Sequence, residues 1–223
     1  MIGLGRYFAV AGVLLVVGCG FELSGLSKSV VVGSGKVASE VRAVAGISSV
    51  SCDGSGEIEL VQDGTESLKI TAEDNILPYL TSAVDGGKLT LSLRKDVSIQ
   101  TTKPILYKIT VKGVKELELL GSGSLKATGL DTKRLKSGIS GSGDMTVAGK
   151  AQREEVTISG SGSYTAPELK CTNAAVIISG SGNVVVAVSD ALDANVSGSG
   201  SVEYIGSPKV TQSVAGSGSI TKR

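Results

Sequence analysis

The tripeptide Gly-Ser-Gly occurs eight times in this 223-residue chain, and its spacing constrains the fold more than any other feature. The copies begin at positions 33, 54, 121, 141, 160, 180, 198 and 216, so the last six recur at a nearly constant interval. A fixed period near 20 residues is typical of a stacked repeat, in which each period packs against its neighbours. A flexible glycine-serine linker would not keep apolar residues in register on both sides of every copy.

Apolar side chains alternate with hydroxyl side chains around each copy. In residues 156–166, Val-Thr-Ile-Ser-Gly-Ser-Gly-Ser-Tyr-Thr-Ala, apolar residues and glycines share one parity and hydroxyl-bearing residues share the other. This alternation indicates strands with one face in a core and the other in water. Because interior glycines weaken a strand unless the backbone bends there, we expect each period to be a strand, a tight bend and a second strand. Such units wind into a coil of parallel strands, a β-solenoid.

The interval between the copies at 54 and 121 keeps the strand pattern without the tripeptide. Residues 69–72, 88–93 and 107–111 alternate, and the length of the interval predicts about three further coils. Asp85-Gly86-Gly87 predicts a tight turn, whereas residues 74–79 read as an irregular crossing. No segment shows helical spacing.

The N-terminus reads as an export signal. Arg6 precedes an apolar run over residues 7–17 that is too short to span a bilayer, and the run ends in Val-Val-Gly followed by Cys19. This order resembles a bacterial lipoprotein signal, in which cleavage exposes a cysteine that is acylated. An ordinary secretory signal is the alternative. We predict a signal peptide over 1–18, a lipidated Cys19 with a tether over 19–36, and a β-helix over 37–223. No aspartate follows Cys19, which favours the outer membrane over the inner one, with the body facing the periplasm or the cell surface.

Charge and cysteine content narrow the possible partners. The chain has 22 basic and 21 acidic residues without a charged run, which argues against nucleic acid as a partner. Export would permit a disulfide. Cys52 and Cys171 nevertheless fall several coils apart, farther than the roughly 7 Å between Cα atoms that a disulfide tolerates. We therefore predict two free, buried thiols.

Several segments resemble a known family. They include the opening Ile-Ser-Ser-Val at 47–50, the strand at 58–62, the stretch 68–77 with Glu73-Asp74-Asn75, and the later Ile-Ser-Gly-Ser-Gly copies. From about residue 41 to the end, the chain resembles the family described as putative auto-transporter adhesin, head GIN domain, a domain of unknown function in exported and lipid-anchored bacterial proteins. The resemblance implies a right-handed parallel β-helix at the cell envelope.

The residue types give little support to catalysis. Histidine is absent, which excludes His-based triads and His metal ligands, and the cysteines lack zinc spacing. Asp144 follows a Gly-Ser-Gly copy as in calcium-binding glycine-aspartate repeats, but it does not recur. Glu73-Asp74-Asn75 is interpreted as a turn rather than a polar site, and Glu154 and Glu155 as an exposed loop. We predict no catalytic, cofactor-binding or metal-binding residue, and a polysaccharide-active enzyme is the least favoured class.

One surface feature suggests binding. If the coils stack in register, six serines form a column with steps of about 4.8 Å; they are Ser122, Ser142, Ser161, Ser181, Ser199 and Ser217. The column would suit a repetitive partner such as a glycan or an envelope protein, unless serine is there only because it tolerates a tight corner. The sequence thus predicts an all-β, single β-helix with repeats of about 19 residues, acting as a non-catalytic, lipid-anchored adhesion or ligand-binding module. The alternative is a self-associating structural protein, because solenoid ends expose unpaired strands. The oligomeric state is left open.

Overall fold

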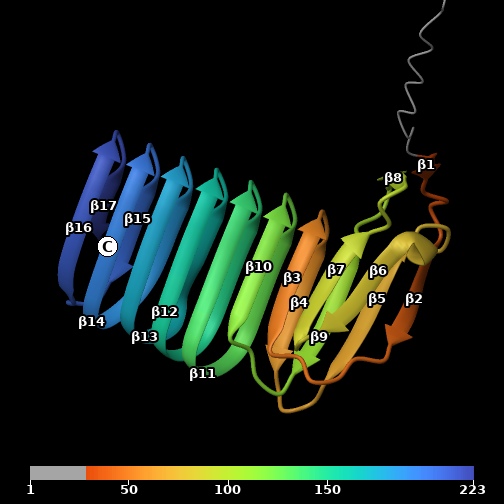
Figure 1. Ribbon diagram of the computed structural model, residues 1–223, viewed down its shortest axis with the longest axis horizontal. Coiled ribbons are helices and arrows are strands. Elements are labelled where there is room, and N and C mark those ends of the chain that lie inside the picture. The colour runs from red at the N-terminus through yellow and green to blue at the C-terminus, as the bar shows by residue number, and fades with distance from the viewer. Residues whose placement is uncertain (1–28) are drawn as a thin grey trace, which may run out of the picture.

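The computed structural model describes residues 29–223, so the expected signal peptide and Cys19 lie outside the described residues. The described chain is an all-β solenoid of about five turns, with one 3₁₀ turn and no α-helix in residues 29–223. Figure 1 shows the turns as rungs that lie side by side from the N-terminal end to the C-terminal end. The predicted all-β solenoid is therefore confirmed.

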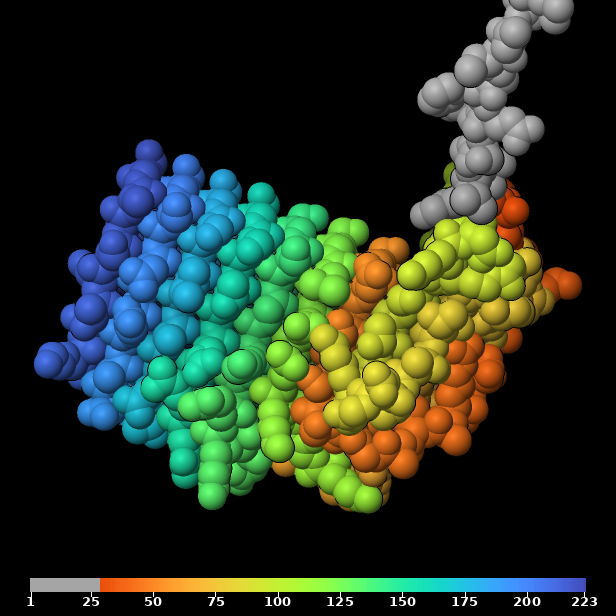
Figure 2. Space-filling view, in the orientation of Figure 1, coloured from red at the N-terminus to blue at the C-terminus, as the bar shows by residue number. Residues whose placement is uncertain are grey.

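The regular rungs come from strands that bend around the coil. Their bounds are β10 (Glu116–Gly121), β11 (Ser124–Gly141), β12 (Asp144–Gly160), β13 (Ser163–Gly180), β14 (Asn183–Gly198), β15 (Ser201–Ile205), β16 (Lys209–Gly216) and β17 (Ser219–Lys222). The start of β11 pairs with β4 (Glu57–Gln62) on one side of the coil, and its end pairs with β10 on the other side. Every pairing in this part is parallel. In the space-filling view the rungs form parallel rows across the molecule (Figure 2).

The Gly-Ser-Gly copies from residue 54 onward form one corner of the coil. Gly54, Gly121, Gly141, Gly160, Gly180, Gly198 and Gly216 are register partners from rung to rung. Gly160 has a φ of +123°, a region that favours glycine. A Cβ on Gly162 would lie 2.5 Å from the Gly143 carbonyl oxygen and 2.6 Å from Cγ2 of Ile139. The predicted bend is confirmed, and close contact between rungs explains why side chains are absent there.

Apolar residues fill the interior in continuous columns. One column consists of Leu119, Ile139, Ile158, Ile178 and Val196, all buried and each paired with the next. The serines and threonines of the same strands point outward, as predicted from the period of two, except Ser137, which is buried in β11. Cys52 and Cys171 are buried and free, which confirms that interpretation.

The N-terminal part combines two rungs of the coil with elements that lie outside it. Its elements are β1 (Ser29–Val32), β2 (Val37–Arg42), β3 (Ser49–Gly54), β5 (Ser67–Glu73), η1 (Leu77–Tyr79), β6 (Leu80–Asp85), β7 (Lys88–Leu93), β8 (Val97–Gln100) and β9 (Leu106–Val111). β3 lies between β7 and β10, and β4 lies between β9 and β11. β3 and β4 thus form one rung between two others. The rung on one side contains β10 and the start of β11, and the rung on the other side consists of β7 and β9.

The prediction of three coils between residues 57 and 120 is therefore wrong. β6 and β7 are antiparallel, β5 is antiparallel to both β2 and β9, and β1 pairs with β8 in a separate two-stranded sheet. Gly86 and Gly87 both have positive φ, as in the two-residue turn of a hairpin. The predicted tight turn thus forms, and it sends the chain back on itself instead of around another coil.

Candidate functional site

The predicted serine column exists and begins one rung earlier than expected. All six predicted serines are exposed at the Gly-Ser-Gly corner. Because Gly54 pairs with Gly121, the exposed Ser55 lies at the head of the column. We call the seven residues Ser55, Ser122, Ser142, Ser161, Ser181, Ser199 and Ser217 the serine ridge. Sequence spacing missed Ser55 because the long interval between Gly54 and Gly121 interrupts the period.

Backbone hydrogen bonds fix the ridge and leave its hydroxyls exposed. The Ser142 N–H donates to the Gly121 carbonyl at 3.0 Å, and the Ser161 N–H donates to the Gly141 carbonyl at 2.9 Å. The same bond recurs from Ser181 to Gly160 and from Ser199 to Gly180 at 2.9 Å. In residues 29–223 no side-chain hydrogen bond engages a ridge hydroxyl. The Ser201 hydroxyl, which is not part of the ridge, donates to Asn183 Oδ1 at 2.7 Å. The hydroxyls thus remain able to donate and accept in a regular row.

Two further columns of small polar residues flank the ridge. Ser140, Ser159, Ser179 and Ser197 follow one side in register and are exposed. The other side carries Glu57, Ser124, Asp144, Ser163, Asn183, Ser201 and Ser219. The first column continues through Leu120 to the exposed Asp53, so Asp53, Glu57 and Asp144 are the charged members of these columns. From Ser161 onward the corner is uncharged and rich in hydroxyls.

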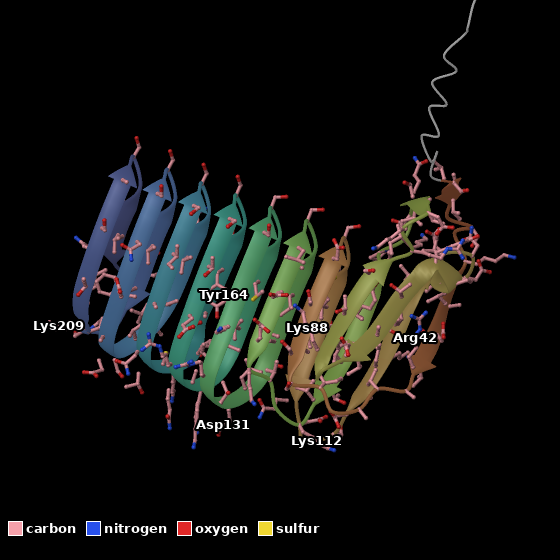
Figure 3. All side chains as sticks on the ribbon, viewed as in Figure 1. Arg42, Lys88, Lys112, Asp131, Tyr164 and Lys209 are labelled. Carbon is pink, nitrogen blue, oxygen red and sulfur yellow. The ribbon has the colours of Figure 1, made fainter. Side chains whose placement is uncertain are left out.

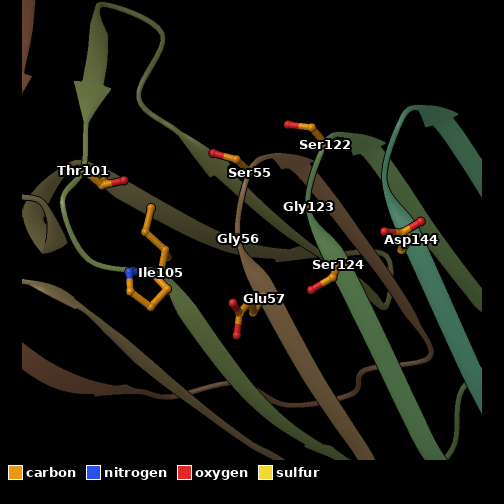
Figure 4. Close-up of a pocket in the computed structure, with 10 residues that line it drawn as sticks. Ser55, Gly56, Glu57, Thr101, Ile105, Ser122, Gly123, Ser124 and Asp144 are labelled. Atoms are coloured by element: carbon orange, nitrogen blue, oxygen red, sulfur yellow. The ribbon is translucent and has the colours of Figure 1, made fainter. Parts of the chain in front are cut away.

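A groove of about 310 Å³ lies at the head of the ridge (Figure 4). Its ridge side carries Ser55 and Ser122 with the flanking residues Glu57, Ser124 and Asp144, and its other wall comes from the loop between β8 and β9, with Thr101, Pro104 and Ile105. In the described part of the chain, no ion pair engages Glu57 or Asp144. The loop reaches this position because β9 pairs with β4, a long-range contact that the repeat period does not predict.

Comparison with known proteins places this architecture in a family. A family model described as putative auto-transporter adhesin, head GIN domain, matches residues 47–208. The chain belongs to this family. The membership confirms the resemblance seen in the sequence, and it indicates a location at the cell envelope or surface. The family description names no catalytic activity. No curated protein matches the chain.

Solved structures share the fold at low sequence identity. A putative adhesin from Bacteroides fragilis has a TM-score of 0.68 and 24% identity, with 86% of this chain and 100% of that chain covered. A putative lipid binding protein from Parabacteroides distasonis has a TM-score of 0.54 and 24% identity, covering 87% and 100%. A putative adhesin from Parabacteroides merdae has a TM-score of 0.52 and 20% identity, covering 87% and 99%. At these identities the likeness concerns the fold alone.

Glu73-Asp74-Asn75 holds the first Gly-Ser-Gly copy, which is not part of the ridge. The buried Glu73 carboxylate accepts hydrogen bonds from the Gly35 N–H at 2.7 Å, the Thr102 N–H at 3.0 Å and the Thr102 hydroxyl at 2.7 Å. The Thr102 hydroxyl, followed by backbone N–H groups, lowers the pKa of Glu73 below its ordinary value despite desolvation. Asn75 Oδ1 accepts from the Ser34 N–H at 2.9 Å, and its Nδ2 donates to the Val32 carbonyl at 2.8 Å.

These bonds make the Glu73-Asp74-Asn75 stretch a clasp on the segment 32–35, which falls within the expected tether. Asp74 completes it by accepting from the Ser34 hydroxyl at 2.5 Å. A Cβ on Gly33 would lie 2.0 Å from Glu73 Oε2, so the clasp requires a residue without a side chain there. The turn interpretation expected polar side chains of this stretch to bind nearby backbone. In the structure Asn75 does bind backbone, but that backbone belongs to residues 32–34, about 40 positions earlier in the sequence.

The interpretation of Glu154 as part of an exposed loop is wrong. Glu154 is fully buried in β12, where it accepts a hydrogen bond from the hydroxyl of the equally buried Tyr164. Burial raises the pKa of Glu154 to about 7, against the opposing effect of this hydrogen bond. Its inward direction follows from register, since it pairs with the interior residues Leu135 and Ala174. Glu155 points to the surface and pairs with Arg153 at 3.0 Å.

The described residues contain no candidate metal centre. Residues 29–223 contain no cluster of three or more Cys, Asp or Glu side chains arranged to hold a metal ion. Asp144 belongs to the groove and has no second aspartate beside it in the flanking column. Over the same residues, no helix is long and apolar enough to cross a membrane. The arrangement that the geometry does provide is the serine ridge with its groove.

Proposed function

We propose that this protein is a non-catalytic adhesion module of the bacterial cell envelope that binds a repetitive, uncharged polymer along the serine ridge. The observation that carries the proposal is the row of seven exposed hydroxyls, held in register by backbone bonds and unengaged by other side chains. A polymer with hydroxyl groups at regular intervals, such as a neutral glycan, matches a row of paired donors and acceptors. Each contact exchanges a bond to water for a bond to the ligand, so affinity must come from several rungs together.

The groove would receive the part of the polymer nearest the N-terminal end. Its hydroxyls and carboxylates are acceptors for sugar hydroxyls, and Pro104 and Ile105 provide an apolar wall. The groove contains no aromatic side chain on which a sugar ring can stack. We therefore expect weak binding per sugar and a strong dependence on polymer length.

The ridge is tested by adding bulk without charge. The variant with Ser142→Gln, Ser161→Gln and Ser181→Gln should lose at least about tenfold in affinity for a neutral polysaccharide found by screening the body on a glycan array. A matched control carries Thr157→Gln, Asn195→Gln and Ser213→Gln, three exposed positions on the sheet face away from the ridge. Equal affinities of the two variants, or an array without any signal for neutral glycans, would refute this function.

We further propose that Cys19 carries the lipid that holds this module at the membrane, with the outer membrane as its site. The support is the order of apolar run, small residue and cysteine at the N-terminus. Mass spectrometry of the N-terminal peptide should detect a diacylglyceryl group on Cys19, and Cys19→Ala should move the protein from the membrane fraction to the soluble fraction. An unmodified Cys19 in mature, membrane-associated protein would contradict the anchor.

A further inference from the structure

The corner opposite the serine ridge gathers lysines that are scattered in the sequence. Lys133, Lys150 and Lys170 lie where β11, β12 and β13 bend, and all three are exposed. Lys150 is the register partner of Lys170 on one side and of Asp131 on the other. Figure 3 shows Asp131 at this lower corner, away from the strand tips that mark the ridge. We call Lys133, Lys150 and Lys170 the lysine corner.

The positive charge of the lysine corner is only partly compensated. Among the described residues, no ion pair engages Lys133, Lys150 or Lys170, whereas the neighbouring Arg134 and Arg153 both lie within 4 Å of Glu155, at 3.8 and 3.0 Å. Directly opposed like charges on neighbouring strands destabilise a sheet, and Lys150 and Lys170 are such a pair. Asp131 is the one acidic residue in the groove between these lysines. An anionic ligand would relieve the repulsion.

The groove itself has donors suited to an anion. It measures about 550 Å³, and Gln152 and Thr172 add an amide and a hydroxyl beside the three ammonium groups. Ammonium groups act as point charges toward carboxylate or phosphate. Each exposed contact contributes at most about 1 kcal/mol, so a single anion would bind weakly. Lys150 and Lys170 lie in register on rungs about 4.8 Å apart, and Lys133 lies on the preceding rung, two residues beyond Asp131, the partner of Lys150. Several anions on one polymer could therefore bind together.

We propose that the lysine corner binds a polysaccharide whose repeating units carry carboxylate or phosphate groups. A polysaccharide is favoured over a nucleic acid because the 21 acidic residues of the chain offset its 22 basic ones and because the groove has no aromatic side chain for base stacking. The site lies on the opposite corner from the serine ridge, so it does not depend on the function proposed there. It would give the module a second, charge-dependent contact with envelope polymers.

The test compares polymers that differ only in charge, on the folded body. Polygalacturonate and phosphomannan are the anionic probes, and methyl-esterified polygalacturonate and dephosphorylated mannan are their neutral counterparts. We expect the body to bind each anionic probe at least about tenfold more tightly than its neutral counterpart. The anionic affinity should fall steeply between roughly 50 and 300 mM salt.

Matched variants locate the binding. Lys133→Gln with Lys150→Gln and Lys170→Gln should lose about tenfold or more in affinity for the anionic probes. The control carries Lys36→Gln, Lys95→Gln and Lys103→Gln, which removes the same charge from exposed lysines near the N-terminal end and should change affinity less than about twofold. The proposal would be overturned by equal losses of affinity in both variants or by equal affinity for anionic and neutral polymers. It would also be overturned if the body bound a DNA duplex or anionic lipid vesicles more tightly than either anionic polysaccharide.

Discussion

A single carboxyl group, that of Glu154, interrupts the apolar interior of the regular rungs. The other members of its inward column are Leu135, Ala174, Leu192 and the partly buried Val210. Because burial raises the pKa of Glu154 to about 7, the folded chain keeps this proton at pH values where the unfolded chain has released it. The folded state therefore binds more protons than the unfolded state between the two pKa values, and its stability falls as pH rises through that window.

The free energy of unfolding should accordingly decrease by up to about 3 kcal/mol between pH of about 4.5 and pH of about 7.5 through Glu154 alone. Glu154→Gln keeps an oxygen acceptor for Tyr164 and removes the titration, so its stability should change less over this range. Urea unfolding of both proteins at several pH values measures the difference, in which the other titrating groups largely cancel. Parallel stability profiles for the two proteins would contradict the buried, titrating Glu154.

At the scale of elements, the clasp ties β1 and the following loop to the end of β5. The substitution Glu73→Ala removes the three hydrogen bonds that the carboxylate accepts from Gly35 and Thr102. We therefore expect the backbone amides of 29–35 to exchange hydrogen at least about tenfold faster. The amides of β11–β14 should keep their protection. The lowered pKa of Glu73 makes the clasp stabilising above the ordinary carboxyl pKa, and this stabilisation is lost as pH falls through the lowered value.

Hydrogen exchange by mass spectrometry at neutral and acidic pH tests both points. Glu57→Ala is the control, because this exposed glutamate has no side-chain hydrogen bond or ion pair among the described residues. Unchanged protection of 29–35 in the Glu73 variant would show that β1 is held by its pairing with β8 alone.

Elements also differ in how far the sequence predicts them. From β10 onward each rung repeats one pattern, so period and parity predict both the corner and the inward residues. Before β10 the Gly86-Gly87 hairpin reverses the chain, and pairings such as β3 with β7 and β4 with β9 depend on contacts that no local pattern encodes. The second corner of each rung has no marker like Gly-Ser-Gly. Glu154 has the parity of the inward residues Val156 and Ile158, but its charge and the absence of a corner marker favour a loop over a longer strand. The convergence of Lys133, Lys150 and Lys170 has no comparable signal in the sequence.

For the whole molecule, stacking makes each rung depend mainly on its two neighbours. β13 and β14 are joined by parallel pairs in which Gly180 lies beside Gly198, so one full turn runs from Gly180 to Ser197. Removing this full turn joins Ser179 to Gly198, which then takes the corner position of Gly180. The residues that follow keep the same alternation of inward and outward side chains. A half-turn cut, from Gly180 to Val188, joins one corner of the coil to the opposite one.

We predict that the full-turn deletion folds as a shorter solenoid and the half-turn deletion does not. The full-turn deletion should retain a β-sheet circular dichroism spectrum and one cooperative thermal transition, at a lower Tm because six buried side chains and one rung interface are lost. Those side chains are Val184, Val186, Val188, Leu192, Ala194 and Val196. The half-turn deletion should show no cooperative thermal transition, because the residues after the cut can no longer pair in register with β13. If the full-turn deletion also failed to fold, the rungs would not be interchangeable units, and the solenoid would depend on contacts beyond nearest neighbours.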